Sequence, residues 1–75
     1  MMATFQAKVG ASVRARRVEL GISQEKLGEI AGLDRTYISG VERGVRNPTI
    51  DSLARIAKGL KCTMSALIAD AESRR

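Results

Sequence analysis

The sequence contains no histidine, no tryptophan and only one cysteine among its 75 residues. A zinc-type centre needs several Cys or His ligands, and a Cys nucleophile needs a neighbouring base such as His, so neither can form within one chain. A single cysteine also excludes an internal disulfide and is typical of a reducing cytosol. We therefore expect no metal, no cofactor and no enzymatic activity.

Long apolar runs are missing as well. No stretch approaches the roughly 18 residues that a membrane-spanning helix needs, and the N-terminus lacks the apolar segment of a signal peptide. We therefore expect a cytoplasmic protein with no membrane partner. Apolar residues make up 44% of the chain, which is enough for one small core. The expectation is a single domain over residues 1–75.

Charge of one sign is in excess, with 13 Lys and Arg against 8 Asp and Glu and a net charge of +5. Such a balance favours an anionic partner such as nucleic acid. The positive charges are spread along the chain, however, and no basic tail is present. A phosphate-binding surface therefore has to be argued from the positions of individual arginines.

The spacing of apolar residues predicts five short helices. Each predicted helix begins at a residue whose side chain can cap it, and three of them end at a glycine that can leave the helical conformation. The predicted helices cover residues 4–21, 23–32, 34–44 and 49–60, and a fifth begins at Thr63. Pro48 makes residues 45–48 a loop. No segment shows the alternation of a strand, so the fold class is all-α. The residues expected on the apolar sides are Phe5, Val9, Val13, Leu20, Leu27, Ile30, Ala31, Leu33, Ile38, Val41, Ile50, Leu53, Ile56, Ala57, Leu60, Met64, Leu67 and Ile68.

The second and third predicted helices are joined by a turn too tight for an antiparallel pair. Such helices cross at a wide angle, which is the helix-turn-helix arrangement whose second helix enters the DNA major groove. Gly28 lies where the third helix would approach closely, and Gly32 can take the positive φ of the turn. The outer face of the third helix is polar or small and comprises Arg35, Thr36, Ser39, Gly40 and Arg43.

Four segments in this region carry a family resemblance. They are SQEKLG at residues 23–28, AGL at 31–33, TYISGVERG at 36–44 and RNPT at 46–49. Together, over about residues 8–69, the chain resembles the lambda-repressor and Cro type of helix-turn-helix domain, also called the xenobiotic-response-element family. The run DRTYIS at residues 34–39 is particularly similar to the small controller proteins of restriction–modification systems. The resemblance implies a compact bundle of five helices around a central helix-turn-helix.

The resemblance also assigns roles in DNA binding. The residues placed against base edges are Arg35, Thr36, Ser39 and Gly40, and those placed against phosphates are Gln24, Tyr37, Arg43, Arg46 and Asn47. The Arg35 fork suits guanine O6 and N7. Thr36 and Ser39 would equally suit a solvated face, and the Tyr37 ring could instead pack at the edge of the core. Gly40 departs from the longer polar residue often found at its position in the family.

Further roles follow from the same resemblance. Arg17 and Glu42 match a pair that forms an internal salt bridge. Glu25 and Glu29 match an acidic surface that contacts RNA polymerase in activators, although a solvated surface is the simpler interpretation. Residues near the C-terminus, which are Leu60, Met64, Leu67 and Ile68, are expected at a dimer interface or in the core. Cys62 is expected to be a small core residue.

The sequence thus predicts a sequence-specific transcription regulator that binds double-stranded DNA. It is expected to act as a homodimer on a near-palindromic operator, with no small-molecule ligand. Regulation by its own concentration is the simplest scheme for so short a chain, and the controller-protein resemblance favours a dual role. Repression and activation both stay open at this stage. The alternative is an antitoxin-type module that binds a partner protein and its own promoter.

Overall fold

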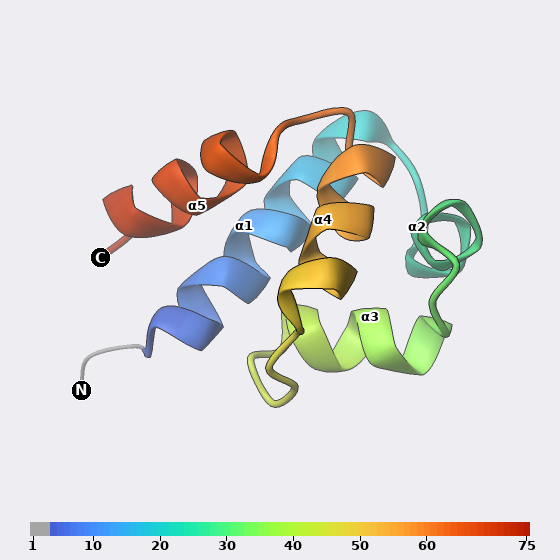
Figure 1. Ribbon diagram of the computed structural model, residues 1–75, viewed down its shortest axis with the longest axis horizontal. Helices are drawn as coiled ribbons and strands as arrows, with labels where there is room; N and C mark the ends of the chain where they lie inside the picture. The colour runs from blue at the N-terminus through green and yellow to red at the C-terminus, as the bar shows by residue number, and fades with distance from the viewer. Residues whose placement is uncertain (1–3) are drawn as a thin grey trace.

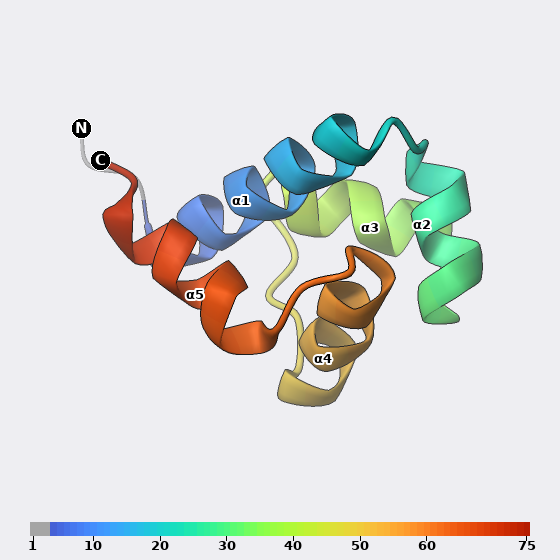
Figure 2. The same cartoon turned by 90° about the horizontal axis from the view of Figure 1, so that it is seen from above.

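The computed structural model describes residues 4–75, which form five α-helices and no strand. The helices are α1 (Phe5–Leu20), α2 (Gln24–Ala31), α3 (Arg35–Glu42), α4 (Ile50–Gly59) and α5 (Met64–Ser73). Helix α1 packs against both α3 and α5, while α2 packs against α3 and α4 (Figure 1). Seen from above, α2 and α5 lie at opposite ends of the molecule (Figure 2). The prediction of an all-α fold is confirmed.

Hydroxyl side chains begin four of the five helices, as predicted. The Oγ atoms of Thr4, Ser23, Thr49 and Thr63 each accept a hydrogen bond from the backbone N–H three residues later, at 2.9–3.1 Å. Each bond satisfies an amide that the first turn of a helix leaves free. Asp34 occupies the N-cap position of α3, but its side chain makes no capping hydrogen bond.

Glycines end the first two helices in the left-handed conformation, with φ values of 72° at Gly21 and 70° at Gly32. The third helix is shorter than predicted. It ends at Glu42 with Arg43 as its C-cap, and Gly44 follows at φ 76°. The turn after α3 is held by two backbone hydrogen bonds, in which the N–H groups of Val45 and Arg46 both donate to the Gly40 carbonyl oxygen.

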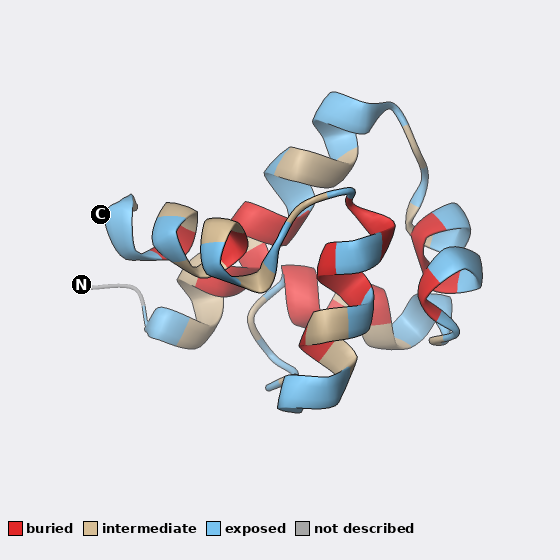
Figure 3. Cartoon of the chain, turned by 45° about the horizontal axis from the view of Figure 1, so that its top comes forward, coloured by how far each residue is buried: buried red, intermediate tan, exposed pale blue. Residues whose placement is uncertain are grey.

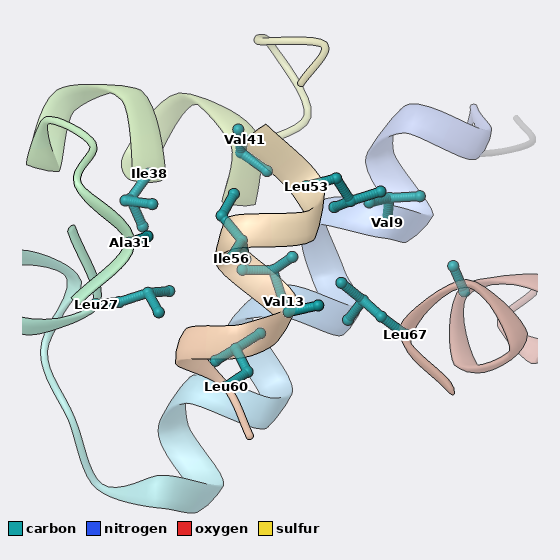
Figure 4. Close-up of a cluster of buried hydrophobic side chains, with 12 residues drawn as sticks. Val9, Val13, Leu27, Ala31, Ile38, Val41, Leu53, Ile56, Leu60 and Leu67 are labelled. Atoms are coloured by element: carbon teal, nitrogen blue, oxygen red, sulfur yellow. The ribbon is translucent and has the colours of Figure 1, made fainter. Parts of the chain in front are cut away.

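All five helices contribute to one hydrophobic core (Figure 4). The buried residues, red in Figure 3, lie where the helices face one another, while the outer side of α2 and the start of α4 are exposed. The buried hydrophobic residues are Val9, Val13, Leu27, Ala31, Ile38, Val41, Leu53, Ile56, Ala57, Leu60, Leu67 and Ala71. Cys62 is half-buried and packs against this core, as expected.

Four residues that were predicted on apolar sides lie in solvent. Phe5, Leu20, Ile30 and Ile50 expose 47%, 40%, 52% and 80% of their surfaces. Three of them stand at the first or last position of a helix, and Ile30 is next to the last residue of α2. Helix ends have fewer neighbours than helix centres, so helical spacing alone overstated the burial of these residues. Between residues 4 and 75 no helix is long and apolar enough to cross a membrane.

Candidate nucleic-acid interface

The α2–turn–α3 segment is held by close backbone contacts. A Cβ on Gly28 would lie 2.5 Å from the Leu33 carbonyl oxygen, and the Leu33 N–H donates to the Gly28 carbonyl at 2.8 Å. A side chain at position 28 would therefore force the turn away from α2. The buried side chains of Leu27 and Ile38 join the two helices to the core. These contacts fix how α3 is presented.

The first turn of α3 presents uncommitted polar side chains. Arg35 and Thr36 are exposed, and Ser39 is half-buried. The four ion pairs among residues 4–75 involve Arg17, Lys26, Arg55 and Arg74, so Arg35 belongs to none of them. A cation in the first turn of a helix opposes the helix dipole and gains no stability there. The Arg35 guanidinium is available to an external partner.

Gly40, which was expected to face a base edge, is buried instead. An added Cβ would stand 3.0 Å from the Cβ of Arg46 and 3.9 Å from a methyl group of Val45. The loop after α3 therefore lies directly over this glycine. Gly40 has no side chain and its main chain is covered, so it has no atom to offer to a base.

The loop after α3 carries three of the predicted phosphate-binding residues. Arg43, Arg46 and Asn47 are all exposed. The guanidinium carbon of Arg46 lies 5.3 Å from the centroid of the Tyr37 ring, which is cation–π geometry. Tyr37 itself is half-buried and packs against the core, so the core-edge interpretation of its ring is correct.

A buried ion pair connects α1 with α3, in the place that the family resemblance gave it. Arg17 Nε donates to Glu42 Oε2 at 2.6 Å, and a second guanidinium nitrogen donates to Oε1 at 3.1 Å. The side chains of Arg17 and Glu42 are 12% and 2% exposed. Arg17 also donates to the Ile22 carbonyl at 2.9 Å. Ile22 lies in the short connection from α1 to α2, which begins at Gln24, so the start of α2 adjoins this pair.

The side chain of Gln24 also binds the Glu42 carboxylate. Its Nε2 donates to Glu42 Oε1 at 3.1 Å, whereas the sequence placed it against a phosphate. A buried carboxylate needs several donors, and Gln24 at the first position of α2 supplies one of them. One Nε2 hydrogen is therefore committed inside the protein, and a phosphate would meet the second hydrogen or the backbone amides of this helix end.

Arg55 has a structural role that the sequence analysis missed. Its guanidinium donates to the carbonyls of Ala31 and Gly32 at 2.9 and 2.8 Å, and it lies 3.6 Å from Asp51. It thereby satisfies two carbonyls at the end of α2, where the helix dipole favours a cation. The i, i+4 spacing of Asp51 and Arg55 was visible in the sequence, but its contact with α2 was not.

A second polar cluster ties α5 to α1. Arg74 Nε donates to the hydroxyl of the fully buried Ser12 at 2.9 Å and to Asp70 at 3.2 Å. The Ser12 hydroxyl, and then the Arg74 and Arg16 guanidinium groups, hold the pKa of Asp70 below its ordinary value of 3.8, although burial opposes the shift. This cluster lies away from α3 and stabilises the last helix.

The expected dimer residues divide into two groups. Leu60 and Leu67 are 3% and 0% exposed, so they belong to the core of the single chain and the interface expectation is wrong for them. Met64 and Ile68 are half-buried and keep an outer side. An apolar groove beside them is lined by Phe5, Gln6, Val9, Asn47, Pro48, Leu53 and Ile68. The acidic residues Glu25 and Glu29 are exposed on α2, with Lys26 3.8 Å from Glu29.

Comparison with known proteins places this architecture among DNA-binding regulators. The helix-turn-helix family matches residues 13–67. The control protein C.SmaI of Serratia marcescens is 46% identical over 57 residues, which are 76% of this chain and 68% of that protein. The control protein C.MunI of a Mycoplasma species is 39% identical over 59 residues, covering 79% of this chain and 80% of that protein.

A solved structure of another controller protein has the same fold as this chain. The restriction–modification controller protein C.AhdI from Aeromonas hydrophila is 39% identical and superposes with a TM-score of 0.81, over 83% of this chain and 94% of that one. The resemblance noted in the sequence is thereby confirmed. The chain belongs to the helix-turn-helix family of DNA-binding transcription regulators, and its relatives include restriction–modification controller proteins.

Proposed function

We propose that this chain is a sequence-specific regulator that binds a near-palindromic operator as a homodimer and controls a restriction–modification system, including its own expression. The observation that carries the proposal is the exposed first turn of α3. Thr36 and Ser39 lie on one face of α3 by their spacing. Arg43 is the C-cap of that helix, and Arg46 rests against Gly40. One surface therefore combines base-reading and phosphate-binding groups.

On this surface the side chains divide the work of recognition. Helix α3 would lie in the major groove with Arg35 donating its two nitrogens to a guanine, an interaction worth about 1–3 kcal/mol of discrimination. Thr36 and Ser39 would contact neighbouring base edges. Arg43, Arg46, Asn47, the Tyr37 hydroxyl and the start of α2 at Gln24 would contact phosphates and fix the register. Gly40 is no longer assigned to a base.

The dimer would form on the side of the molecule away from α2. Met64 and Ile68 keep apolar surface there, and the neighbouring groove between Phe5 and Leu53 offers more. We propose that a second copy of the chain covers this surface about a two-fold axis. Residues 1–75 would then act as one domain, with a core over about residues 8–69 and with dimerisation through α4 and α5.

An activating role would need a protein contact in addition to DNA. The exposed carboxylates of Glu25 and Glu29 lie on the helix that precedes α3. Negative charge beside a DNA-binding helix weakens phosphate attraction, which favours a protein partner for this surface. We propose RNA polymerase as that partner where the protein activates transcription. Replacing both residues by Gln should then abolish activation without weakening operator binding.

The decisive experiment is a selection of random DNA with the purified protein, followed by binding measurements over a range of salt concentrations. We expect a two-fold symmetric site and a steep fall of log K with log salt, because several phosphates are neutralised. Arg35→Ala should lose preference at one base position in each half-site. Failure to enrich any sequence, or an affinity insensitive to salt, would contradict the proposed function.

A further inference from the structure

The arginine that follows α3 is held from two sides by that helix. Tyr37 and Gly40 are three residues apart, so they lie on the same face of α3. The Tyr37 ring supports the guanidinium of Arg46, whose carbon lies 5.3 Å from the ring centroid. Gly40 supports the stem, because its missing Cβ leaves the space that the Arg46 Cβ and Cγ approach.

The backbone of the same loop is also fixed on Gly40. The N–H groups of Val45 and Arg46 donate to the Gly40 carbonyl oxygen at 3.0 and 3.1 Å. The turn is closed by Gly44 at φ 76°, and its carbonyl accepts a hydrogen bond from the Gln6 side chain at 2.7 Å. The main chain on both sides of Arg46 is thus set before any partner arrives.

We propose that Gly40 and Tyr37 are positioning residues that pre-organise Arg46 for a phosphate of the operator. This inference rests on the proposed DNA-binding function and deepens it. An arginine side chain has many rotamers, and ordering one at an interface costs affinity unless the free protein already holds it. Gly40 thus contributes to recognition indirectly, by leaving room for the side chain of Arg46.

The proposal makes two positions without a base contact sensitive to substitution. Gly40→Ala would push the Arg46 stem away, and Tyr37→Leu would remove the surface under its guanidinium. Gly40→Ala should weaken operator binding about two- to tenfold, the amount expected when one long side chain loses its pre-organisation. Tyr37→Leu should weaken binding by a similar factor relative to Tyr37→Phe, because both variants lack the hydroxyl that is proposed to contact a phosphate. Tyr37→Phe keeps the ring and removes only the hydroxyl, so it should preserve the support of Arg46.

A double-mutant cycle tests the coupling. Operator affinity and its salt dependence would be measured for the wild type, Gly40→Ala, Arg46→Ala and the double variant. Arg46→Ala alone should reduce the slope of log K on log salt by about 1. In the Gly40→Ala background the same change should cost much less affinity. The matched control is Arg43→Ala, whose loss should be equal in both backgrounds. Equal, additive losses for Arg46 would overturn the proposal.

A measurement without DNA separates this inference from the proposed function. The ring current of an aromatic residue at 37 should shift the Arg46 δ-methylene protons upfield in the NMR spectrum of the wild type and of Tyr37→Phe. The shift should vanish in Tyr37→Leu and decrease in Gly40→Ala. An unshifted Arg46 in the wild type would overturn the positioning role. If the wild type bound no DNA, the proposed function would fail, and the spectrum would still show whether Arg46 is held.

Discussion

At the residue scale, the buried Arg17–Glu42 pair links the fold to the interface. Glu42 ends the helix that is proposed to read DNA, and its carboxylate accepts bonds from α1 and from Gln24 at the start of α2. The pair is nearly inaccessible to water, so each charge depends on the other for its solvation. One carboxylate therefore adds to the packing contacts that orient α3 relative to α1 and α2.

Glu42→Ala should destabilise the protein strongly for this reason. It would leave the Arg17 guanidinium buried without its partner, which costs about 3–5 kcal/mol of unfolding free energy. Urea denaturation followed by circular dichroism would measure the loss. Glu29→Ala is the matched control, because Glu29 pairs with Lys26 in solvent and should change stability by less than about 1 kcal/mol. Equal midpoints for the two variants would show that the buried pair contributes little.

At the element scale, the helix-turn-helix is attached to α4 by Arg55. This side chain crosses from α4 to the last carbonyls of α2 and sits beside the turn glycine, Gly32. Helix α2 has only eight residues, too few to be stable alone, so contacts at its end carry weight. The angle between α2 and α3 thus depends partly on a third helix.

Arg55→Met should loosen the end of α2 while keeping most of the apolar stem. We expect a loss of about 1–2 kcal/mol, because two charge-assisted hydrogen bonds are lost but the group is partly exposed. Hydrogen exchange should accelerate most at the amides of Gly32 and Leu33. Lys58→Met, on an exposed site of the same helix, should change stability by no more than about 0.5 kcal/mol. Unchanged exchange at the turn in Arg55→Met would contradict the tether.

The attachment of α5 should depend on pH through Asp70. Its pKa is lowered in the folded protein, so the carboxylate contributes stability above its ordinary pKa of 3.8 and loses that contribution as the pH falls through the lower, folded value. Asp70→Asn should therefore lower the melting temperature at pH 7 and have progressively less effect below about pH 4. Thermal denaturation of both proteins from pH 7 to pH 2.5 would show this. A constant difference across that range would exclude the carboxylate as its source.

The limits of sequence-based prediction are also clearest at this scale. Helix starts were predictable because capping is local: the hydroxyls of Thr4, Ser23, Thr49 and Thr63 each bind the backbone N–H three residues later. Ile50 was wrongly predicted on the apolar side, because its exposure depends on which other elements reach the start of α4. The base-reading candidates on α3 follow from helical spacing and family likeness, whereas the burial of Gly40 follows from a loop that folds back over the helix. The exposure of such residues depends on packing between segments that are distant in sequence, which the periodicity of apolar residues does not predict.

At the scale of the whole molecule, the geometry restricts where a second copy can bind. The chain measures 33 × 23 × 21 Å. Two recognition helices on successive turns of DNA stand about 34 Å apart, so each α3 must lie roughly 17 Å from the two-fold axis. Helix α2 lies at one end of the molecule, and α5 lies at the other (Figure 2). A dimer through the start of α4 and through α5 has to meet this spacing, and it would leave α2 free.

Ile50→Ser tests that surface with little risk to the fold. Ile50 is 80% exposed at the first position of α4, between Pro48 and Leu53 of the apolar groove in sequence. If a second copy covers it, two isoleucines lose their burial in each dimer, and the dimer dissociation constant should rise at least about tenfold. Analytical ultracentrifugation over a concentration series would measure the change. The control is Ile30→Ser, the same substitution at an exposed isoleucine of α2, at the end of the molecule opposite α5. If Ile30→Ser raised the dimer dissociation constant as much as Ile50→Ser, the interface would include α2. The two-fold axis would then lie near α2 and the adjoining turn rather than near α4 and α5.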